Sequence, residues 1–314
     1  MLEPRTTPLY AYDAPDGAET SAPVKEAGDG EMIPSMRLTD RDRRILEAVH
    51  AYDGILADTQ IKALFFTGDS QMQLRTRLLC QHGYLKRPTR KQRAALTRGV
   101  YWLGERGAAY VAGLSGQPLA EFAWRKEPRW GQLEHDLTLN DVRIAFVQAC
   151  HGNPDFAIDE WIPSTEFWAH PDRVTYTLAN GRSASRFVRP DAYMVISQGE
   201  YSGKFLLEVD LSTEDQPRIA RDKLLPLVAY LRSEAYKKRF GYTSGRILFV
   251  TTGDRRLSNL KRNAEVATGP DARLFYFTTL SQLTAQTVLQ TPIWLRGGQE
   301  EAVGLFRTAE LEKV

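Results

Sequence analysis

Three acidic residues near the middle of the chain have the types and the spacing to act together on a phosphate or a metal ion. Asp191 lies in the run 189–196, and Glu208 and Asp210 lie in the run 204–211. Both runs alternate apolar and polar residues at period two, which is typical of β-strands. The short segment between them is polar and glycine-containing, so we expect an antiparallel hairpin.

The register of this hairpin follows from burial. A slip of one residue would turn an apolar face toward the polar side, so the two apolar faces should align. Folding about residue 200 then brings Asp191 opposite or diagonal to Glu208 and Asp210. Carboxylates so close repel one another unless a cation or a proton is shared. Because Mg²⁺ prefers oxygen ligands and commonly takes one or two carboxylates, Asp191 and Glu208 are the candidate metal ligands.

The same residues have a second interpretation that needs no metal. Asp191 could pair with Arg189, and either of the later acids could pair with Lys223 or Arg221. Such an ion-pair network would stabilise the sheet and do no chemistry. Both interpretations stay open at the level of the sequence.

Length and composition favour a two-domain protein of the cytoplasm. The chain has 314 residues, 42% of them hydrophobic, which is ample for globular folding. Its two cysteines, Cys80 and Cys150, have no pairing motif and no zinc-ligand spacing, as expected in a reducing compartment. The N-terminus lacks a signal-peptide pattern, and no apolar run approaches the ~20 residues that a membrane helix needs. Membrane partners are therefore not expected.

Positive charge is concentrated in one part of the chain. The formal net charge is +2, yet residues 70–104 contain no acid and eight basic residues, which leaves −6 for the rest. The eight are Arg75, Arg77, Lys86, Arg87, Arg90, Lys91, Arg93 and Arg98.

The basic stretch falls within a recognisable order of elements. Residues 1–36 lack periodicity and are expected to be a disordered leader. Helices are predicted from about residue 40, from about residue 57, and over 71–82, followed by two short strands at 84–87 and 99–103 that form a hairpin. We expect Leu74, Leu78 and Leu79 to face inward from the third helix.

Three helices followed by a basic hairpin resemble a winged helix-turn-helix. In that family the third helix enters the major groove of duplex DNA and the wing follows the backbone. Arginine and glutamine suit guanine and adenine edges, whereas loop Lys and Arg suit phosphates. The alternative is a winged helix that contacts protein. The DNA-binding residues that the resemblance implies are Gln71, Gln73, Arg75, Arg77, Lys86, Arg87, Arg90, Lys91 and Arg93.

The second half alternates helices and strands, and it resembles the PD-(D/E)xK nuclease fold. We expect a helix over 130–150, strands at 156–163 and 173–178, the hairpin, a helix over 216–236, a strand at 246–251, a helix over 257–267 and strands at 273–277 and 292–295. The resemblance implies Asp191 and Glu208 as metal-holding acids. Asp210 stands where the family has a lysine, a departure that puts cleavage in doubt, and Lys223 on the following helix could supply that charge. The catalytic candidates are thus Asp191, Glu208, Asp210 and Lys223, with Mg²⁺ as cofactor.

The combination is similar to the replication-relaxation family of bacterial plasmids and mobile elements. The motifs behind this resemblance are Arg-Pro-Asp at 189–191, Phe-Leu-Leu-Glu-Val-Asp at 205–210, Lys223 and Tyr230. The resemblance would cover about residues 38–280; together with the leader expected over 1–36, it implies an α+β protein with a winged helix-turn-helix over 37–124 and a nuclease-like α/β domain over 125–314.

Two functions follow from that resemblance. The first is a duplex-DNA-binding protein, acting in replication or transfer or regulating them, with a degenerate nuclease-like domain. The second is a metal-dependent DNA endonuclease aimed by the winged helix. The expected partners are double-stranded DNA, a second copy of the chain on a palindromic site, and replication or transfer proteins.

Overall fold

The computed structural model describes residues 36–178, 180–212 and 216–307. The predicted leader therefore lies outside the described residues, apart from residue 36. The chain divides into two compact units between Ile144 and Ala145, and each is described by itself. Helices and strands are mixed in an α+β structure, as expected. The domain boundary predicted near residue 125 stays a prediction.

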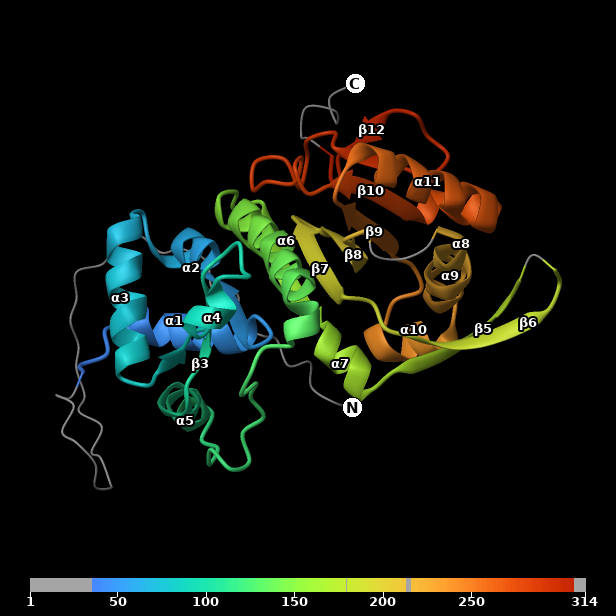
Figure 1. The fold of residues 1–314 in the computed structure, drawn as a ribbon. Helices are drawn as coiled ribbons and strands as arrows, with labels where there is room; N and C mark the ends of the chain where they lie inside the picture. The colour runs from blue at the N-terminus through green and yellow to red at the C-terminus, as the bar shows by residue number, and fades with distance from the viewer. Residues whose placement is uncertain (1–35, 179, 213–215, 308–314) are drawn as a thin grey trace. The chain divides into compact units, whose positions relative to one another are not determined.

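The first unit combines short helices with a small antiparallel sheet (Figure 1). Strand β3 lies in the middle of this sheet, between β1 and β2. The elements are α1 (Asp40–Ala51), β1 (Ile55–Ala57), α2 (Asp58–Phe65), α3 (Asp69–Gln81), β2 (Leu85–Lys86), α4 (Arg90–Arg93), β3 (Val100–Leu103), α5 (Glu105–Leu114), the 3₁₀ turn η1 (Trp130–Gln132), and the first part of α6 (Leu133–His151).

Helix α1 begins where the sequence places its cap. The Thr39 side chain accepts a hydrogen bond from the backbone N–H of Asp42, whose carboxylate accepts in return from the Thr39 backbone at 2.8 Å. This capping box satisfies N–H groups that the first turn of a helix leaves without partners. Helix α2 likewise begins at the predicted place, and Gln60 accepts a hydrogen bond from the backbone of Ala57.

The buried face of α3 agrees only in part with the predicted one: Leu79 is buried as predicted and Leu78 is half-buried, but the prediction is wrong for Leu74. Met72, Thr76 and Leu79 are buried, whereas Leu74 is 47% exposed. Thr76 can be buried because its hydroxyl donates to the backbone carbonyl of Met72 at 2.9 Å. Leu74 therefore faces solvent, and Thr76 lies on the buried face of the helix.

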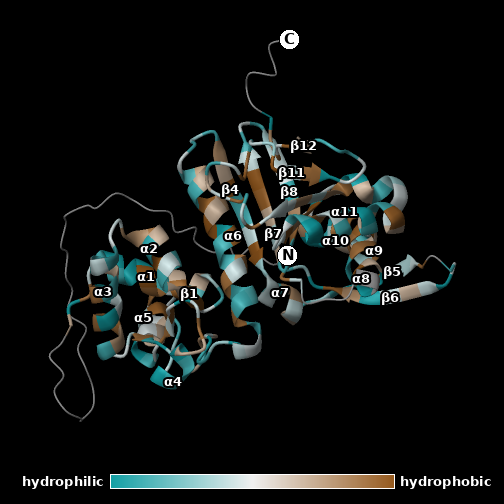
Figure 2. Ribbon diagram, turned by 45° about the horizontal axis from the view of Figure 1, so that its top comes forward, coloured by the Kyte–Doolittle hydropathy of each residue, from teal (hydrophilic) through white to brown (hydrophobic). Residues whose placement is uncertain are grey.

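The second unit contains a seven-stranded sheet among its described residues. The strands follow one another in the order β12-β11-β10-β9-β8-β7-β4. Figure 2 shows hydrophobic residues concentrated on the strands in the middle of this sheet. The elements from β4 to β8 are β4 (Phe156–Pro163), α7 (Ser164–Ala169), β5 (Asp172–Thr177), β6 (Ser183–Val188), β7 (Ala192–Gln198) and β8 (Tyr201–Asp210). The later ones are α8 (Gln216–Ile219), the π-helical turn η2 (Ala220–Leu224), α9 (Leu225–Leu231), α10 (Glu234–Phe240), β9 (Arg246–Thr251), α11 (Asp254–Thr268), the 3₁₀ turn η3 (Gly269–Leu274), β10 (Phe275–Thr279), β11 (Trp294–Arg296) and β12 (Ala302–Val303).

The central hairpin has the predicted register. Strands β7 and β8 are antiparallel, with Ala192 opposite Leu207 and Met194 opposite Phe205, so the two apolar faces align. The turn is tighter than expected, because the strands continue to Gln198 and resume at Tyr201. Gly199 adopts a φ of +56°, a conformation that glycine adopts without strain.

Strand β8 continues the sheet by pairing in parallel with β9, and β9 pairs in parallel with β10. Side chains of β7–β10 pack on one face against side chains of α9 and α11 in a single hydrophobic cluster. The helix predicted over 216–236 is divided: it passes from α8 through η2 to α9, which ends before Ser233 caps the separate helix α10.

Strands β5 and β6 form a separate two-stranded hairpin, which we call the arm (Figure 1). The sequence predicts β5 but not β6, and it assigns residues 188–191 to the following strand. In the structure Asp172 pairs with Val188 and Thr177 with Ser183. Val174, Tyr176 and Val188 belong to the hydrophobic cluster beneath the arm, so one face of the hairpin is buried.

Candidate functional site

Asp191 and Glu208 lie at the same end of the β7–β8 hairpin. The backbone N–H of Asp191 donates to the carbonyl of Leu207 at 3.0 Å, which extends the ladder one residue before the start of β7. The Asp191 carboxylate accepts a hydrogen bond from the backbone N–H of Val209 at 2.7 Å. The predicted convergence of Asp191 on the Glu208 segment is therefore present.

Glu208 is buried and ion-paired. It is 3% exposed, and its carboxylate lies 2.9 Å from Nζ of Lys223. A buried carboxylate is costly unless a counter-charge and hydrogen bonds compensate for lost hydration, and Lys223 supplies that charge. The structure thus brings together three of the predicted residues, Asp191, Glu208 and Lys223.

Lys223 reaches Glu208 from the π-helical turn η2. A π-helical turn inserts an extra residue into a helix, and such turns are frequent at functional sites. Here the turn carries the consecutive charged residues Arg221, Asp222 and Lys223. The sequence identifies Lys223 as a candidate, but its helical periodicity does not reveal the local change of pitch.

Asp210 pairs with Arg256, and not with Lys223 or Arg221, the ion-pair partners that the sequence suggests. Its carboxylate accepts from Nε of Arg256 at 2.7 Å and from Nη2 at 3.0 Å, and the Thr251 hydroxyl lies 3.0 Å away. Planar two-point pairing of this kind is a strong form of ion pair. Asp210 is therefore joined to α11, whereas Glu208 is joined to η2. The sequence does not single out Arg256 as the partner, since 46 positions separate the two residues.

Asp191 and Glu208 are the two side chains predicted to bind a metal ion at this site. Across residues 36–178, 180–212 and 216–307, no group of three or more His, Cys, Asp or Glu side chains is arranged to hold a metal ion. Two carboxylates can nevertheless suffice for Mg²⁺ when water and phosphate complete its shell. Asp191 and Glu208 are the pair of that kind predicted here, and Mg²⁺ binding stays a prediction.

A second candidate site lies on α3 of the first unit. Gln71, Gln73 and Arg77 are exposed along this helix, as predicted. Arg75 is not: its Nε donates to the Asp42 carboxylate at 2.8 Å, and its Nη2 makes a second contact with the same group. This hydrogen bond to Asp42 raises the pKa of Arg75. The structure therefore gives Arg75 a role in joining α3 to the start of α1.

The remaining predicted DNA-binding residues begin with Lys86 at the end of β2 and continue through the segment between β2 and β3. Helix α4 opens with a capping box at Thr89 and projects basic side chains. All five predicted residues of this segment are exposed to solvent: Lys86, Arg87, Arg90, Lys91 and Arg93. Arg98, the last basic residue of the acid-free stretch, instead pairs with Asp141 at 2.6 Å.

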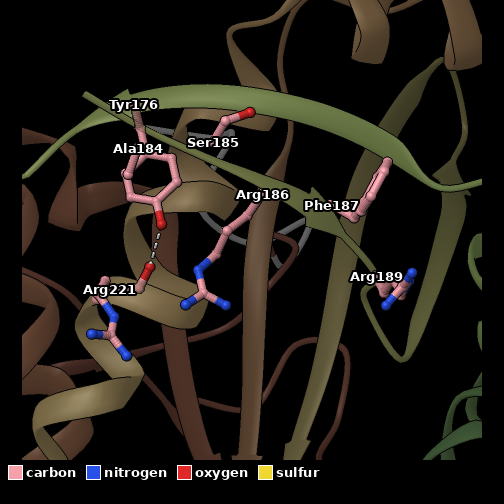
Figure 3. A pocket seen from close by; sticks show the side chains of 7 residues that line it. All are labelled: Tyr176, Ala184, Ser185, Arg186, Phe187, Arg189 and Arg221. Carbon is pink, nitrogen blue, oxygen red and sulfur yellow. Dashed lines mark hydrogen bonds between the residues drawn. The ribbon is translucent and has the colours of Figure 1, made fainter.

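Sequence reasoning missed a group of charged and aromatic residues at the arm. Figure 3 shows an open pocket there, in which the side chains of Tyr176 and Arg186 extend from the arm toward the helix that carries Arg221. The Tyr176 hydroxyl donates to the backbone carbonyl of Arg221 at 2.8 Å. The signal in the sequence was the Arg-Phe-Val-Arg run at 186–189, in which two cations flank an aromatic and a β-branched residue.

Asp222 organises two of these arginines. Its carboxylate lies 2.6 Å from Arg186 and 2.7 Å from Arg221. The hydrogen bond from Arg221 and the positive charge of Arg186 lower the pKa of Asp222 despite partial burial. The carboxylate therefore stays ionised and holds the arm to η2 by charge.

Comparison with known proteins identifies one family. Residues 50–243, which are more than half of the chain, match the model of the replication-relaxation family. A search of curated proteins and a search of solved structures each find no match. Among the helices of the described residues, none has the length and apolar character needed to cross a membrane.

Proposed function

The chain belongs to the replication-relaxation family, and we propose that it is a duplex-DNA-binding protein of a plasmid or other mobile element. It acts in replication or transfer, or regulates them, in the cytoplasm. The observation that carries this proposal is the pairing, within one compact unit, of a helix with exposed Gln and Arg side chains and a basic segment without acids.

The order of elements in the first unit supports a winged helix-turn-helix. Helices α2 and α3 are joined by three residues, a connection typical of that motif. Strands β2 and β3 pair antiparallel after α3, and the basic segment between them takes the place of the wing. Helix α3 is then the recognition helix, and α4 lies in the wing.

The exposed residues of α3 have the chemistry for reading bases. Gln73 and Arg77 are four residues apart and share one face of the helix, with the exposed Leu74 beside them. Gln can contact adenine and Arg guanine in the major groove, and an apolar side chain can contact the thymine methyl group. Arg90, Lys91 and Arg93 suit phosphates, which position the protein but carry no sequence information.

Binding to duplex DNA at several salt concentrations tests this function. Changing Gln73 and Arg77 together to Ala should weaken affinity for the specific site by roughly tenfold or more, since each good base contact contributes about 1–3 kcal/mol. Changing Arg90, Lys91 and Arg93 together should weaken binding to all sequences and reduce the slope of log affinity against log salt by about 2–3.

The matched control changes Arg255 and Arg262 to Ala, because both are exposed on α11 of the other unit. This variant should bind duplex DNA like the unaltered protein. Equal losses in the control and in the α3 and α4 variants would overturn the assignment of the DNA-binding surface. Unchanged binding in all variants would do the same.

A specific observation favours a second function, metal-dependent DNA cleavage. The resemblance to the PD-(D/E)xK fold requires a lysine near two acids, and position 210 lacks it. In the structure Nζ of Lys223 lies 2.9 Å from Glu208, on a strand paired with the Asp191 segment. A lysine thus reaches the acidic pair from η2, which supports a relocated catalytic group.

In that function Asp191 and Glu208 would hold Mg²⁺, which would polarise the scissile phosphate and lower the pKa of a bound water molecule. Lys223 would stabilise negative charge on the phosphate. Two observations argue against cleavage. Asp210, which occupies the position of the family lysine, is paired with Arg256, and Glu208 is already paired with Lys223. We therefore place the DNA-binding function first.

Incubation with supercoiled and linear DNA distinguishes the two functions. The protein is assayed with Mg²⁺, Mn²⁺ or EDTA beside the variant Asp191→Asn with Glu208→Gln, which keeps side-chain size and removes both charges. Metal-dependent nicking that disappears in the variant would establish the endonuclease. Binding without nicking under every condition would leave a DNA-binding protein with a degenerate nuclease-like domain.

A further inference from the structure

The arm and the preceding helix α7 carry exposed aromatic side chains with guanidinium groups beside them. The guanidinium carbon of Arg189 lies 4.2 Å from the centre of the Trp168 ring and 5.5 Å from that of Phe187. That of Arg173 lies 5.4 Å from Phe187. Trp168 is 56% exposed and Phe187 is 52% exposed. Two large rings thus remain open to solvent in fixed positions, which calls for an explanation because exposed aromatic rings are favoured at binding sites.

The edge of the same surface is strongly basic. The pocket of about 530 Å³ beside β6 is lined by Arg186, Arg189 and Arg221 (Figure 3). Asp222 is the carboxylate that pairs with two of them, and it fixes the guanidinium groups of Arg186 and Arg221 in place. Asp172, the nearest acid on β5, pairs with Arg239 at 2.6 Å and so does not neutralise this group. Positive charge therefore exceeds negative charge along this edge.

Both faces of the arm carry guanidinium groups, and the outer face adds an aromatic ring. Arg186 shares the inner face with Val174 and Tyr176, whereas Phe187 and Arg173 face outward, because neighbouring residues on a strand point to opposite sides. A ligand that follows β6 would meet the Arg186 guanidinium at the inner face, and at the outer face it would meet the Phe187 ring beside the guanidinium groups of Arg173 and Arg189. A nucleic-acid single strand offers both complements, phosphates along its backbone and unpaired bases with accessible faces.

We propose that the arm, together with the adjoining residues of α7 and η2, binds single-stranded DNA, with Arg186, Arg189 and Arg221 on phosphates and with Phe187 and Trp168 stacked on unpaired bases. Duplex DNA offers the phosphates but keeps its base faces stacked, so the aromatic pair would be unused. This inference deepens the proposed function and rests on it for the choice of DNA.

The proposed single-strand surface is close in sequence to the acidic site. Arg189 is two residues before Asp191, and Arg221 is two residues before Lys223. The two chain segments that supply the acidic site therefore also supply the arm surface. A strand held along β6 is brought to the end of the β7–β8 hairpin where Asp191, Glu208 and Lys223 lie, so the arm would deliver an unpaired strand to that site.

Fluorescence anisotropy with a labelled oligothymidylate of about 16 nucleotides tests the inference on the full chain; this length is at the upper end of known single-strand site sizes. Phe187→Ala and Trp168→Ala should each weaken binding about tenfold, as expected for loss of one stacked base. Arg189→Lys should weaken binding less than Arg189→Gln, because lysine keeps the charge but loses the planar group.

The matched control is Tyr201→Ala, because Tyr201 is 73% exposed and lies at the other end of the β7–β8 hairpin. It should bind the oligothymidylate like the unaltered protein. Quenching of tryptophan fluorescence on binding provides a second measurement, since stacking on Trp168 should quench it and Trp168→Phe should remove that part of the signal. Thermal unfolding of each variant checks that the arm residues are not needed for folding.

The outcomes separate this inference from the proposed function. Loss of single-strand binding in the arm variants, with duplex binding intact, supports the inference. Loss of duplex binding only in the α3 and α4 variants supports the proposed function. Unchanged oligothymidylate affinity in the Phe187 and Trp168 variants overturns the inference, as does a change of oligomeric state in place of a change in affinity. Equal competition by duplex would overturn the choice of single strands.

Discussion

Nζ of Lys223 lies 2.9 Å from a carboxylate oxygen of Glu208, and Glu208 is 3% exposed. This pair joins the π-helical turn η2 to the middle of the sheet. A buried ion pair of this kind contributes little net stability as a whole, because removing both charges from water costs nearly as much as their attraction returns. Removing one partner alone is far more costly, because it leaves a buried charge.

The first prediction follows from that asymmetry. Lys223→Met should lower the free energy of unfolding by about 3–5 kcal/mol, because Glu208 then keeps a buried charge without the Lys223 ammonium group. Adding Glu208→Gln to the same protein should restore most of the loss. Urea unfolding of the single and double variants measures both values. Equal destabilisation by the double and single variants would show that the pair does not act as a unit.

The register of the β7–β8 hairpin could be predicted because period two leaves little choice. Only one alignment buries the apolar faces of both strands, and it places Asp191 beside the Glu208 segment. Lys223 could be named as a candidate from the sequence, but its contact with Glu208 could not be predicted, because the π-helical turn that directs its side chain is a local change of helical pitch. Arg256 could not be anticipated, since its pairing with Asp210 depends on the packing of α11 against the sheet.

Helix α3 shows a different limit of sequence reasoning. With a repeat of 3.6 residues, Leu74, Leu78 and Leu79 form as acceptable a stripe as Met72, Thr76 and Leu79. Packing decided for the second set, and Thr76 is tolerated there through a hydrogen bond to its own helix. Strand β6 was missed because its Ser and Arg residues offer little apolar signal, even though alternate positions face the cluster beneath the arm.

The second prediction separates Arg75 from Arg77 on α3. Asp42 is fully buried and pairs with Arg75, whereas Arg77 is exposed. Arg75→Ala should lower the free energy of unfolding by about 2 kcal/mol, since it removes the charged partner of a buried carboxylate. Arg77→Ala should change stability by less than about 0.5 kcal/mol and weaken binding to duplex DNA instead.

Urea unfolding and duplex-binding measurements on the same two preparations check this contrast. The binding titrations are done well below the unfolding midpoint of the Arg75 variant, so that both proteins are folded. A specific loss of DNA affinity in folded Arg75→Ala, at unchanged stability, would return Arg75 to the base-reading group.

The third prediction concerns two glycines of α5. A Cβ atom at Gly107 would clash with the backbone carbonyl oxygen of Tyr84, whereas one at Gly113 would meet no atom within 4 Å. Gly107→Ala should therefore lower the free energy of unfolding by roughly 2–3 kcal/mol, because the backbone must shift. Gly113→Ala should raise it by roughly 0.5 kcal/mol, because alanine is the better helix former. Opposite signs in chemical unfolding are the expected result, and a stabilising Gly107→Ala would contradict the close packing of α5 on this carbonyl.

The last prediction concerns the two thiols, which are free cysteines. Burial raises the pKa of Cys80 to about 11 and that of Cys150 to about 12, from an ordinary value of 9.0. The thiolate is the reactive form, so at pH 8 iodoacetamide should react with Cys80 roughly a hundredfold, and with Cys150 roughly a thousandfold, more slowly than with an exposed thiol. Adding guanidinium chloride should raise both rates to the exposed value.

The same shifts set the sign of a pH effect on stability. Above about pH 9 the unfolded chain loses these thiol protons while the folded chain keeps them, so the contribution of the two half-buried thiols is complete below pH 9 and decreases as the pH rises toward 11. The variant Cys80→Ala with Cys150→Ala should therefore lose less stability between pH 8 and pH 10.5 than the unaltered protein. Parallel loss in the two proteins, or fast alkylation of the folded chain at pH 8, would show that the thiols are not shielded as the structure places them.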